Sequence, residues 1–209
     1  MHITWLGHSA FKIETKTPLR DDVTILINPY QTPKSDLPRN LKSDITLLTG
    51  GKENTITLSG EPFIIDGPGE YEVKGVMIYA VPIDTGEKDK QMIYHLETEA
   101  LSLIYFGDFR GKLTDELVEK LGSFDILLIP CGNNQALSAK EAAEIVNQME
   151  PRVVVPHSFN PPSRKDPFEA VDPFAKLLGQ KEKEWLPKFK INKKDLPQEE
   201  TKLILLEKT

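Results

Sequence analysis

Short apolar runs separated by glycine and proline fill the first half of the chain, and they predict a region rich in β-strands. Apolar and polar residues alternate over residues 3–14, around a Gly-His-Ser interruption, and a β-branched run follows over residues 23–28. These two runs predict two strands that form a hairpin. Residues 45–48 predict a buried strand that ends at Thr49 and a Gly-Gly turn. Further strands are predicted over residues 56–58, 63–65, 71–81, 94–96 and 101–106.

The pattern changes to helical spacing after residue 113. Thr114 precedes two acidic residues and an apolar face that ends at Gly122, which predicts a helix with a side-chain N-cap. Ser138, with Glu141 three residues later, has the spacing of a capping box at the start of a second helix. A third helix is predicted over residues 168–178, and strands are predicted over residues 126–129, 153–155, 188–191 and 203–206.

The order of these elements predicts an α/β (α+β) fold. Strands come first and then alternate with helices, which indicates two packed sheets with helices covering the outside. Since no Ser/Gly-rich linker interrupts residues 1–209, we expect a single domain. Loops at the ends of strands can aim side chains into a cleft. In this arrangement the candidate strand ends are Thr49-Gly50, Gly107-Asp108 and Pro156-His157.

Composition narrows the function classes. A net charge of -6 and a pI near 5.3 argue against a protein that holds nucleic acid by its phosphates. The one cysteine, Cys131, excludes an intramolecular disulfide framework and fits a reducing compartment, so we expect a cytoplasmic protein. No segment approaches the roughly 18 apolar residues of a membrane span. No membrane partner is therefore expected, and a homo-oligomer remains open.

Six segments, kept in order along the chain, carry a family resemblance. They are ITWLGHSAF (3–11), ILINPY (25–30), DGPGEYEVKGV (66–76), FGDF (106–109), LTDELVEKLGSFDILLIPCG (113–132) and EPRVVVPHSF (150–159). The sequence resembles the metallo-β-lactamase fold superfamily, and in particular small bacterial proteins labelled as beta-lactamase-like metal-dependent hydrolases. The resemblance implies a four-layer αββα sandwich over residues 1–209 and a metal-dependent hydrolase as ancestor.

The resemblance breaks at the loop after residue 49. Functional members of the family carry an H-x-H-x-D-H motif there, whereas this chain has GGKENT over residues 50–55. A zinc ion needs about three or four nitrogen, oxygen or sulfur ligands. The resemblance leaves only Asp108 and His157 at ligand positions, with Asp84 in place of a further histidine. We therefore expect no metal cofactor; the alternative is one divalent ion, which would be zinc, manganese or iron.

The resemblance also implies which residues surround the cleft. His8 follows the first strand, and Gly50, Lys52 and Asn54 occupy the altered loop. A buried carboxylate without metals needs a cation, a proton or water. We therefore expect the Lys52 ammonium to form an ion pair with Asp108 or Asp84, the alternative being a solvated lysine.

Two functions follow from these residues. The first is a non-catalytic binding or scaffold protein that keeps the fold without the dinuclear metal site, because a fold does not carry a function by itself. The second is a remodelled metal-dependent hydrolase of a phosphodiester, lactone or thioester, with a reduced site around Asp108 and His157. For each of these two residues a structural role is the alternative: a turn former at Asp108 and a hydrogen-bonded histidine at His157.

Overall fold

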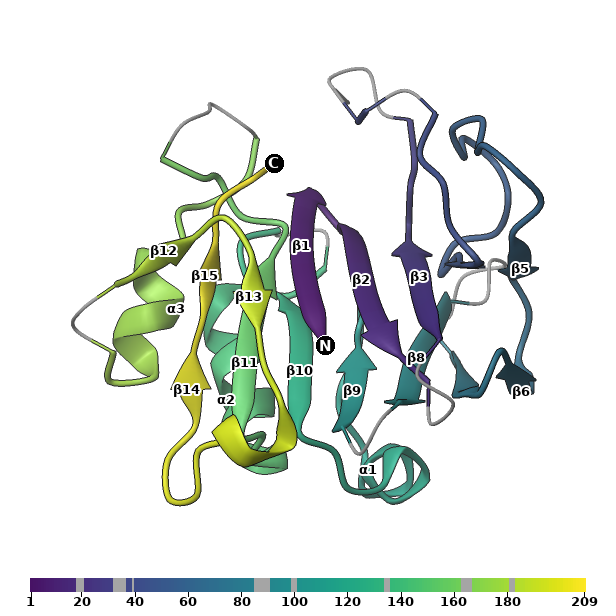
Figure 1. Ribbon diagram of the computed structural model, residues 1–209. Coiled ribbons are helices and arrows are strands. Elements are labelled where there is room, and N and C mark those ends of the chain that lie inside the picture. Colours follow the sequence, from purple (N-terminus) through teal and green to yellow (C-terminus); the bar gives the residue numbers. More distant parts are fainter. Residues whose placement is uncertain are drawn as a thin grey trace.

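Two β-sheets pack face to face at the centre of the molecule (Figure 1). The computed structural model describes residues 1–17, 21–31, 37–38, 40–84, 91–98, 101–133, 136–162, 167–180 and 183–209. None of the helices in these ranges is long and apolar enough to cross a membrane. The predicted mixed α/β fold with two packed sheets is confirmed.

Each large sheet combines antiparallel and parallel strands. The first has the order β13 (Phe189–Lys190), β1 (His2–Gly7), β2 (Ala10–Lys16), β3 (Asp22–Ile27), β4 (Ile45–Leu47), β5 (Phe63–Ile65). The second has the order β14 (Lys202–Leu203), β11 (Val153–His157), β10 (Ile126–Pro130), β9 (Leu101–Tyr105), β8 (Gln91–Thr98), β7 (Val76–Ile83), β6 (Gly69–Val73). A small sheet pairs β12 (Trp185–Leu186) with β15 (Leu205–Leu206).

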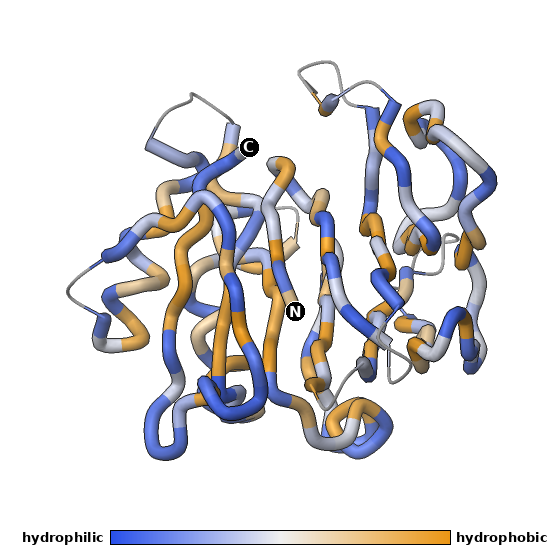
Figure 2. Tube along the Cα trace, in the orientation of Figure 1, coloured by the Kyte–Doolittle hydropathy of each residue, from blue (hydrophilic) through white to orange (hydrophobic). Residues whose placement is uncertain are grey.

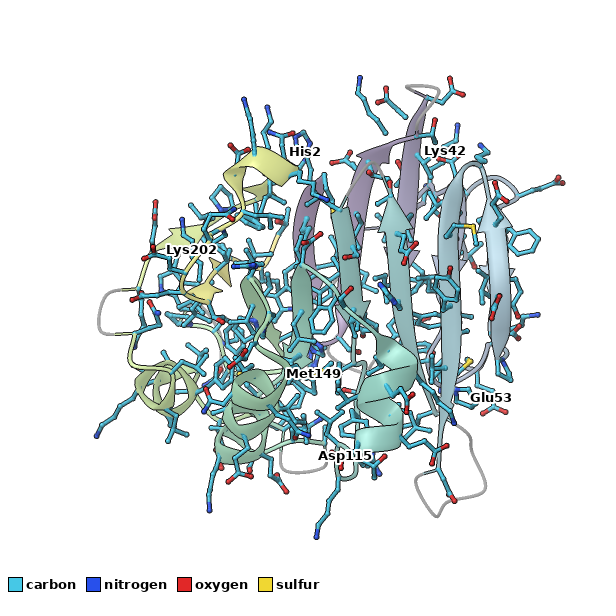
Figure 3. The ribbon with its side chains drawn as sticks, turned by 90° about the horizontal axis from the view of Figure 1, so that it is seen from below. His2, Lys42, Glu53, Asp115, Met149 and Lys202 are labelled. Atoms are coloured by element: carbon cyan, nitrogen blue, oxygen red, sulfur yellow. The ribbon has the colours of Figure 1, made fainter. Side chains whose placement is uncertain are left out.

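The α-helices lie beside the second sheet, on the side away from the first (Figure 3). In α1 (Asp115–Leu121), the Thr114 side chain accepts a hydrogen bond from the backbone N–H of Leu117. The predicted capping box of Ser138 and Glu141 is present at the start of α2 (Ala139–Met149). The remaining helices are α3 (Asp172–Leu177) and the 3₁₀-helix η1 (Lys193–Asp195).

The core between the sheets is built from apolar strand residues, which appear as orange segments in Figure 2. All residues of β10 are buried, because it lies between two parallel neighbours and under helices. Trp5, Phe11 and Tyr105 are among the largest fully buried side chains. Burying one such side chain contributes about 1.5–3 kcal/mol. Cys131 is fully buried as well, and burial raises the pKa of its thiol, which agrees with its predicted role as a small hydrophobe.

Several predicted boundaries are wrong. Residues 3–14 form a complete hairpin of β1 and β2 rather than one interrupted strand. Residues 71–81 contain the hairpin of β6 and β7, because Lys74 and Gly75 both take positive φ angles and reverse the chain. Residues 56–58 form no strand; the N–H of Ile56 instead donates to the carbonyl of Pro29. The third helix begins only at Asp172, since Pro173 fits only the first helical turn.

The strand directions bring the carboxyl ends of six strands to one edge of the molecule. Strands β9, β10 and β11 are mutually parallel, and β1, β3 and β4 run in one direction within the first sheet. The two sets of strand ends touch. The N–H of Ser158 donates to the carbonyl of His8 at 3.1 Å, and a Cβ placed on Gly107 would lie 2.9 Å from Cγ2 of Thr49.

Candidate functional site

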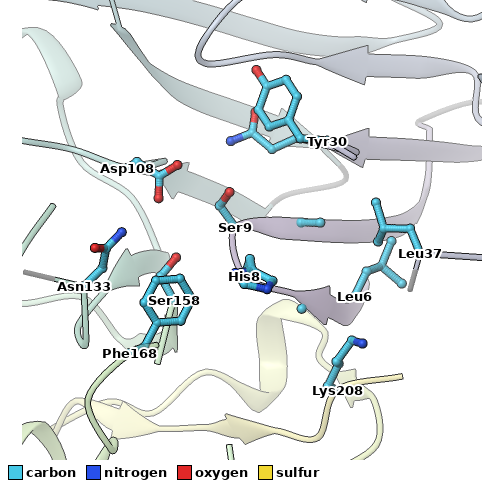
Figure 4. A pocket seen from close by; sticks show the side chains of 13 residues that line it. Leu6, His8, Ser9, Tyr30, Leu37, Asp108, Asn133, Ser158, Phe168 and Lys208 are labelled. Atoms are coloured by element: carbon cyan, nitrogen blue, oxygen red, sulfur yellow. The ribbon is translucent and has the colours of Figure 1, made fainter. Parts of the chain in front are cut away.

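A pocket of about 230 Å³ opens where these strand ends meet (Figure 4). It draws its walls from both large sheets and from the C-terminal tail. The lining residues that the following paragraphs use are His8, Ser9, Asn28, Asp108, Ser158 and Lys208. Of the three predicted strand ends, only Gly107-Asp108 contributes to this cavity, through Asp108.

Three residues of the pocket have a left-handed backbone. His8, Asn28 and Ser158 directly follow β1, β3 and β11, and their φ angles are 50°, 46° and 53°. Such a conformation costs a side-chain-bearing residue about 1–3 kcal/mol and often clusters at functional sites; elsewhere among the described residues it occurs singly, at Asn40, Asn54, Lys74 and Glu150. In the pocket, the strain turns each side chain away from the direction that its strand would give it. This clustering identifies the pocket as the candidate functional site.

Asp108 supplies the carboxylate of the pocket. Burial raises its pKa above the usual value, and the nearby charge of Arg110, together with that of His8 when it is protonated, opposes that rise. The hydroxyl groups of Ser9 and Ser158 also donate hydrogen bonds that favour its charged form. In Figure 4 both serine side chains lie beside Asp108. The arrangement suits a group that binds a cation or exchanges a proton.

His157 does not line the pocket. Its ring is fully buried, stacked on Tyr105 at a centroid distance of 5.4 Å and in edge contact with Phe11. Its Nδ1 lies 3.0 Å from Oγ of Ser158, and its Nε2 has no hydrogen-bond partner among the described residues. Burial lowers its pKa to about 3, so the ring is neutral. It reaches the pocket only through Ser158.

Asn28 joins the two sheets beneath the pocket. Its Nδ2 donates to Oγ1 of Thr49 and to the hydroxyl of Tyr105, both at 2.8 Å. Its Oδ1 accepts the backbone N–H of Thr49 at 2.9 Å. The Tyr105 hydroxyl in turn donates to the carbonyl of Ser9 at 2.6 Å. Sequence reasoning missed Asn28; its only signal was an asparagine between a strand and Pro29.

The altered loop lies outside the pocket. Gly50 donates its N–H to the hydroxyl of Tyr30 at 2.9 Å, and neither Lys52 nor Asn54 lines the cavity. The expected ion pair of Lys52 with Asp108 or Asp84 is not found. The Lys52 ammonium instead lies 3.2 Å from Asp66, and its side chain is 64% exposed, because the Gly-Gly turn carries it to the surface. Asp84 is exposed and also outside the pocket.

The donor set limits which metal the pocket can take. The described residues contain no group of three or more His, Cys, Asp or Glu side chains that could hold an ion. They therefore do not fit a zinc centre or a two-metal site, both of which need such groups. In the pocket, the Asp108 carboxylate and the neighbouring hydroxyl groups of Ser9 and Ser158 offer oxygen ligands, the type that a hard cation such as Mg²⁺ prefers.

Comparison with known proteins identifies the family. The model of the beta-lactamase superfamily domain matches residues 2–158. The chain belongs to the beta-lactamase superfamily. Superfamily relatives include a metal-dependent hydrolase of Pyrococcus abyssi, which is 30% identical over 87% of this chain and 93% of its own length. A metal-dependent hydrolase of Methanopyrus kandleri is 29% identical over 81% of this chain and 89% of its own length.

A solved structure of the superfamily shows the same architecture. It is a Thermotoga maritima protein, assigned as a zinc-dependent hydrolase of the metallo-beta-lactamase superfamily, with a TM-score of 0.82 and 27% identity. The alignment covers 98% of this chain and 97% of that protein. The names of these relatives contradict the expectation that this superfamily member has no metal cofactor. They suggest a metal, although the altered loop supplies no histidine for it.

The Asn28 network makes a testable contribution to stability. We expect Asn28→Ala to lower the free energy of unfolding by about 2–4 kcal/mol, because it leaves the buried N–H of Thr49 without its acceptor. Urea unfolding followed by circular dichroism measures the change. Asn54→Ala, at an exposed position that also has a positive φ angle, is the matched control. A loss no larger than in the control would contradict the role of the network.

His157 gives stability a defined pH dependence. The unfolded chain protonates this histidine near pH 6.5, whereas the folded chain does so only near its depressed pKa of about 3. The contribution of His157 to the free energy of unfolding is therefore fully present above pH 6.5. It falls as the pH drops toward 3, by up to about 1.4 kcal/mol per pH unit. In His157→Gln, unfolding measured between pH 7 and pH 4 should lose less stability than in the wild type. Parallel pH curves would show that the ring is not buried.

Proposed function

We propose that this chain is a hydrolase of small phosphodiesters whose reaction centre is the pocket at Asp108. The observation that carries the proposal is a half-buried carboxylate, hydrogen-bonded by two serine hydroxyls, in a pocket lined by residues that follow β1, β3, β9, β10 and β11. The names of the relatives support a hydrolase. Strained backbone around the pocket supports a site that is maintained for function rather than for stability.

The cation site of this proposal uses oxygen atoms. Asp108 would hold one divalent ion, with the Ser9 and Ser158 hydroxyls beside it. A hard cation bound by a single carboxylate completes its coordination with water and with substrate phosphate, which favours a phosphodiester over a lactone or thioester. When bound, such an ion polarises a phosphoryl oxygen and lowers the pKa of its water.

The other residues of the pocket orient the substrate and move protons. The imidazole of His8 lines the cavity near Asp108, and histidine is suited to take a proton from an attacking water near neutral pH. The contact of its ring with Phe168, at a centroid distance of 5.0 Å, holds it in place. Neutral His157 orients the Ser158 hydroxyl from behind.

Hydrolysis of bis(p-nitrophenyl) phosphate with added Mg²⁺ or Mn²⁺ tests the proposal. We expect Asp108→Asn to lower kcat/KM by about 10²-fold or more and His8→Gln by about 10²-fold, the usual range for removing a proton-transfer group. Asp66→Asn, a carboxylate outside the pocket, is the matched control and should retain the wild-type rate. A rate that survives Asp108→Asn would overturn the assignment.

A second candidate is a protein that binds the same class of anion without turnover. The observation that favours it is the loop over residues 50–55, which has no histidine or aspartate where functional members of the family carry their ligands. Saturable binding of a phosphodiester, with no product formed under any divalent ion, would support this candidate over the hydrolase.

A further inference from the structure

The C-terminal tail crosses the end of β1 and reaches the pocket. The N–H of Glu207 donates to the carbonyl of Leu186 at 2.9 Å, and the N–H of Thr209 donates to the carbonyl of Trp5 at 3.1 Å. Backbone hydrogen bonds therefore fix the chain on both sides of Lys208. Because the backbone is held, the fold sets the point from which the Lys208 side chain extends.

Gly7 leaves room for the Lys208 side chain. A Cβ at Gly7 would lie 2.7 Å from Cε and 3.1 Å from Cδ of Lys208, and the φ angle of Gly7 is 105°. The methylene groups of Lys208 thus pack across a position that no other residue type can occupy without strain. Packing of this kind holds a lysine stem against the surface that it covers.

Lys208 is the one lysine or arginine among the described residues that line the pocket. In Figure 4 it lies on one side of His8, whereas Asp108 lies on the other. The two charges therefore do not share one binding point. A ligand whose reacting group sits at Asp108 would place a different part of itself toward Lys208.

We infer that Lys208 binds a second anionic group of the substrate. This inference rests on the proposed function, and it narrows the substrate class to compounds that carry a carboxylate or phosphate in addition to the reacting ester. A lysine ammonium recognises either group as a point charge with three donors. The cavity of about 230 Å³ limits the ligand to a short spacer between its two anionic groups.

Binding of small phosphonates tests the inference without any turnover. Phosphonoacetate and methylenediphosphonate carry two anionic groups, with a carboxylate and a phosphonate respectively as the second, and methylphosphonate carries one. Isothermal titration with Mg²⁺ present, because the first anionic group meets the Asp108 carboxylate through the cation, should show that the wild type prefers the two-anion probes. Lys208→Met keeps an unbranched side chain across Gly7 and removes the charge. It should lower the affinity for the two-anion probes by about tenfold or more, the size expected for the loss of a charged hydrogen bond. Methylphosphonate affinity should change less than about twofold.

The controls separate this inference from the proposed function. Lys188→Met removes a lysine that pairs with Glu14 outside the pocket, and it should leave all three affinities unchanged. Equal weakening of every probe by Lys208→Met, no weakening, or no binding by the wild type would overturn the inference. If Lys208→Met leaves the rate of phosphodiester hydrolysis unchanged, the proposed hydrolase activity is retained without a role for Lys208. Lys208-dependent binding without hydrolysis under any cation supports the anion site and contradicts the hydrolase.

Discussion

The hydrogen-bond network of Asn28 is the constraint on which the site depends. The Asn28 side chain is buried, so water cannot replace its partners, and its bonds to Thr49 and Tyr105 tie the end of β3 to β4 and to the opposite sheet. Through the Tyr105 hydroxyl the same network fixes the carbonyl of Ser9, and Ser9 contacts Asp108. Polar groups that must be satisfied therefore hold the two sheets in the register that forms the pocket.

Local signals predicted the elements whose formation is decided locally. Two such elements are the helix that begins at the capping box of Ser138 and Glu141 and the strand formed by the continuous apolar run of β10. The residues that determine each of them lie close together in the sequence, and both elements appear as predicted. The turn at Lys74 and Gly75 was missed although the apolar positions change phase there, from residues 71 and 73 to residues 76, 78 and 80. Residues 56–58 resemble a strand, but the N–H of Ile56 donates to the carbonyl of Pro29, in the connection after β3, and no strand ladder forms there.

The site shows the same division between local and distant causes. Asp108 could be placed near a cleft because it lies just beyond a strand, and His8 because the family resemblance put the end of the first strand there. His157 is one residue away from such a place: as the last residue of β11 it points into the core, and Ser158, with its positive φ angle, faces the pocket instead. Asn28 and Lys208 could not be predicted, because their partners lie far away in the sequence. A site built from such partners is visible only after folding.

The central claim is that the Asp108 pocket holds one divalent cation in a reduced site of the superfamily. A titration with Mn²⁺, followed by the electron paramagnetic resonance signal of the free ion, tests it most directly. The account predicts one bound Mn²⁺ per wild-type chain and an affinity at least about tenfold weaker in Asp108→Asn, since that carboxylate is the anionic group of the site. Equal binding by the wild type and Asp108→Asn, or no binding by either, would contradict the account.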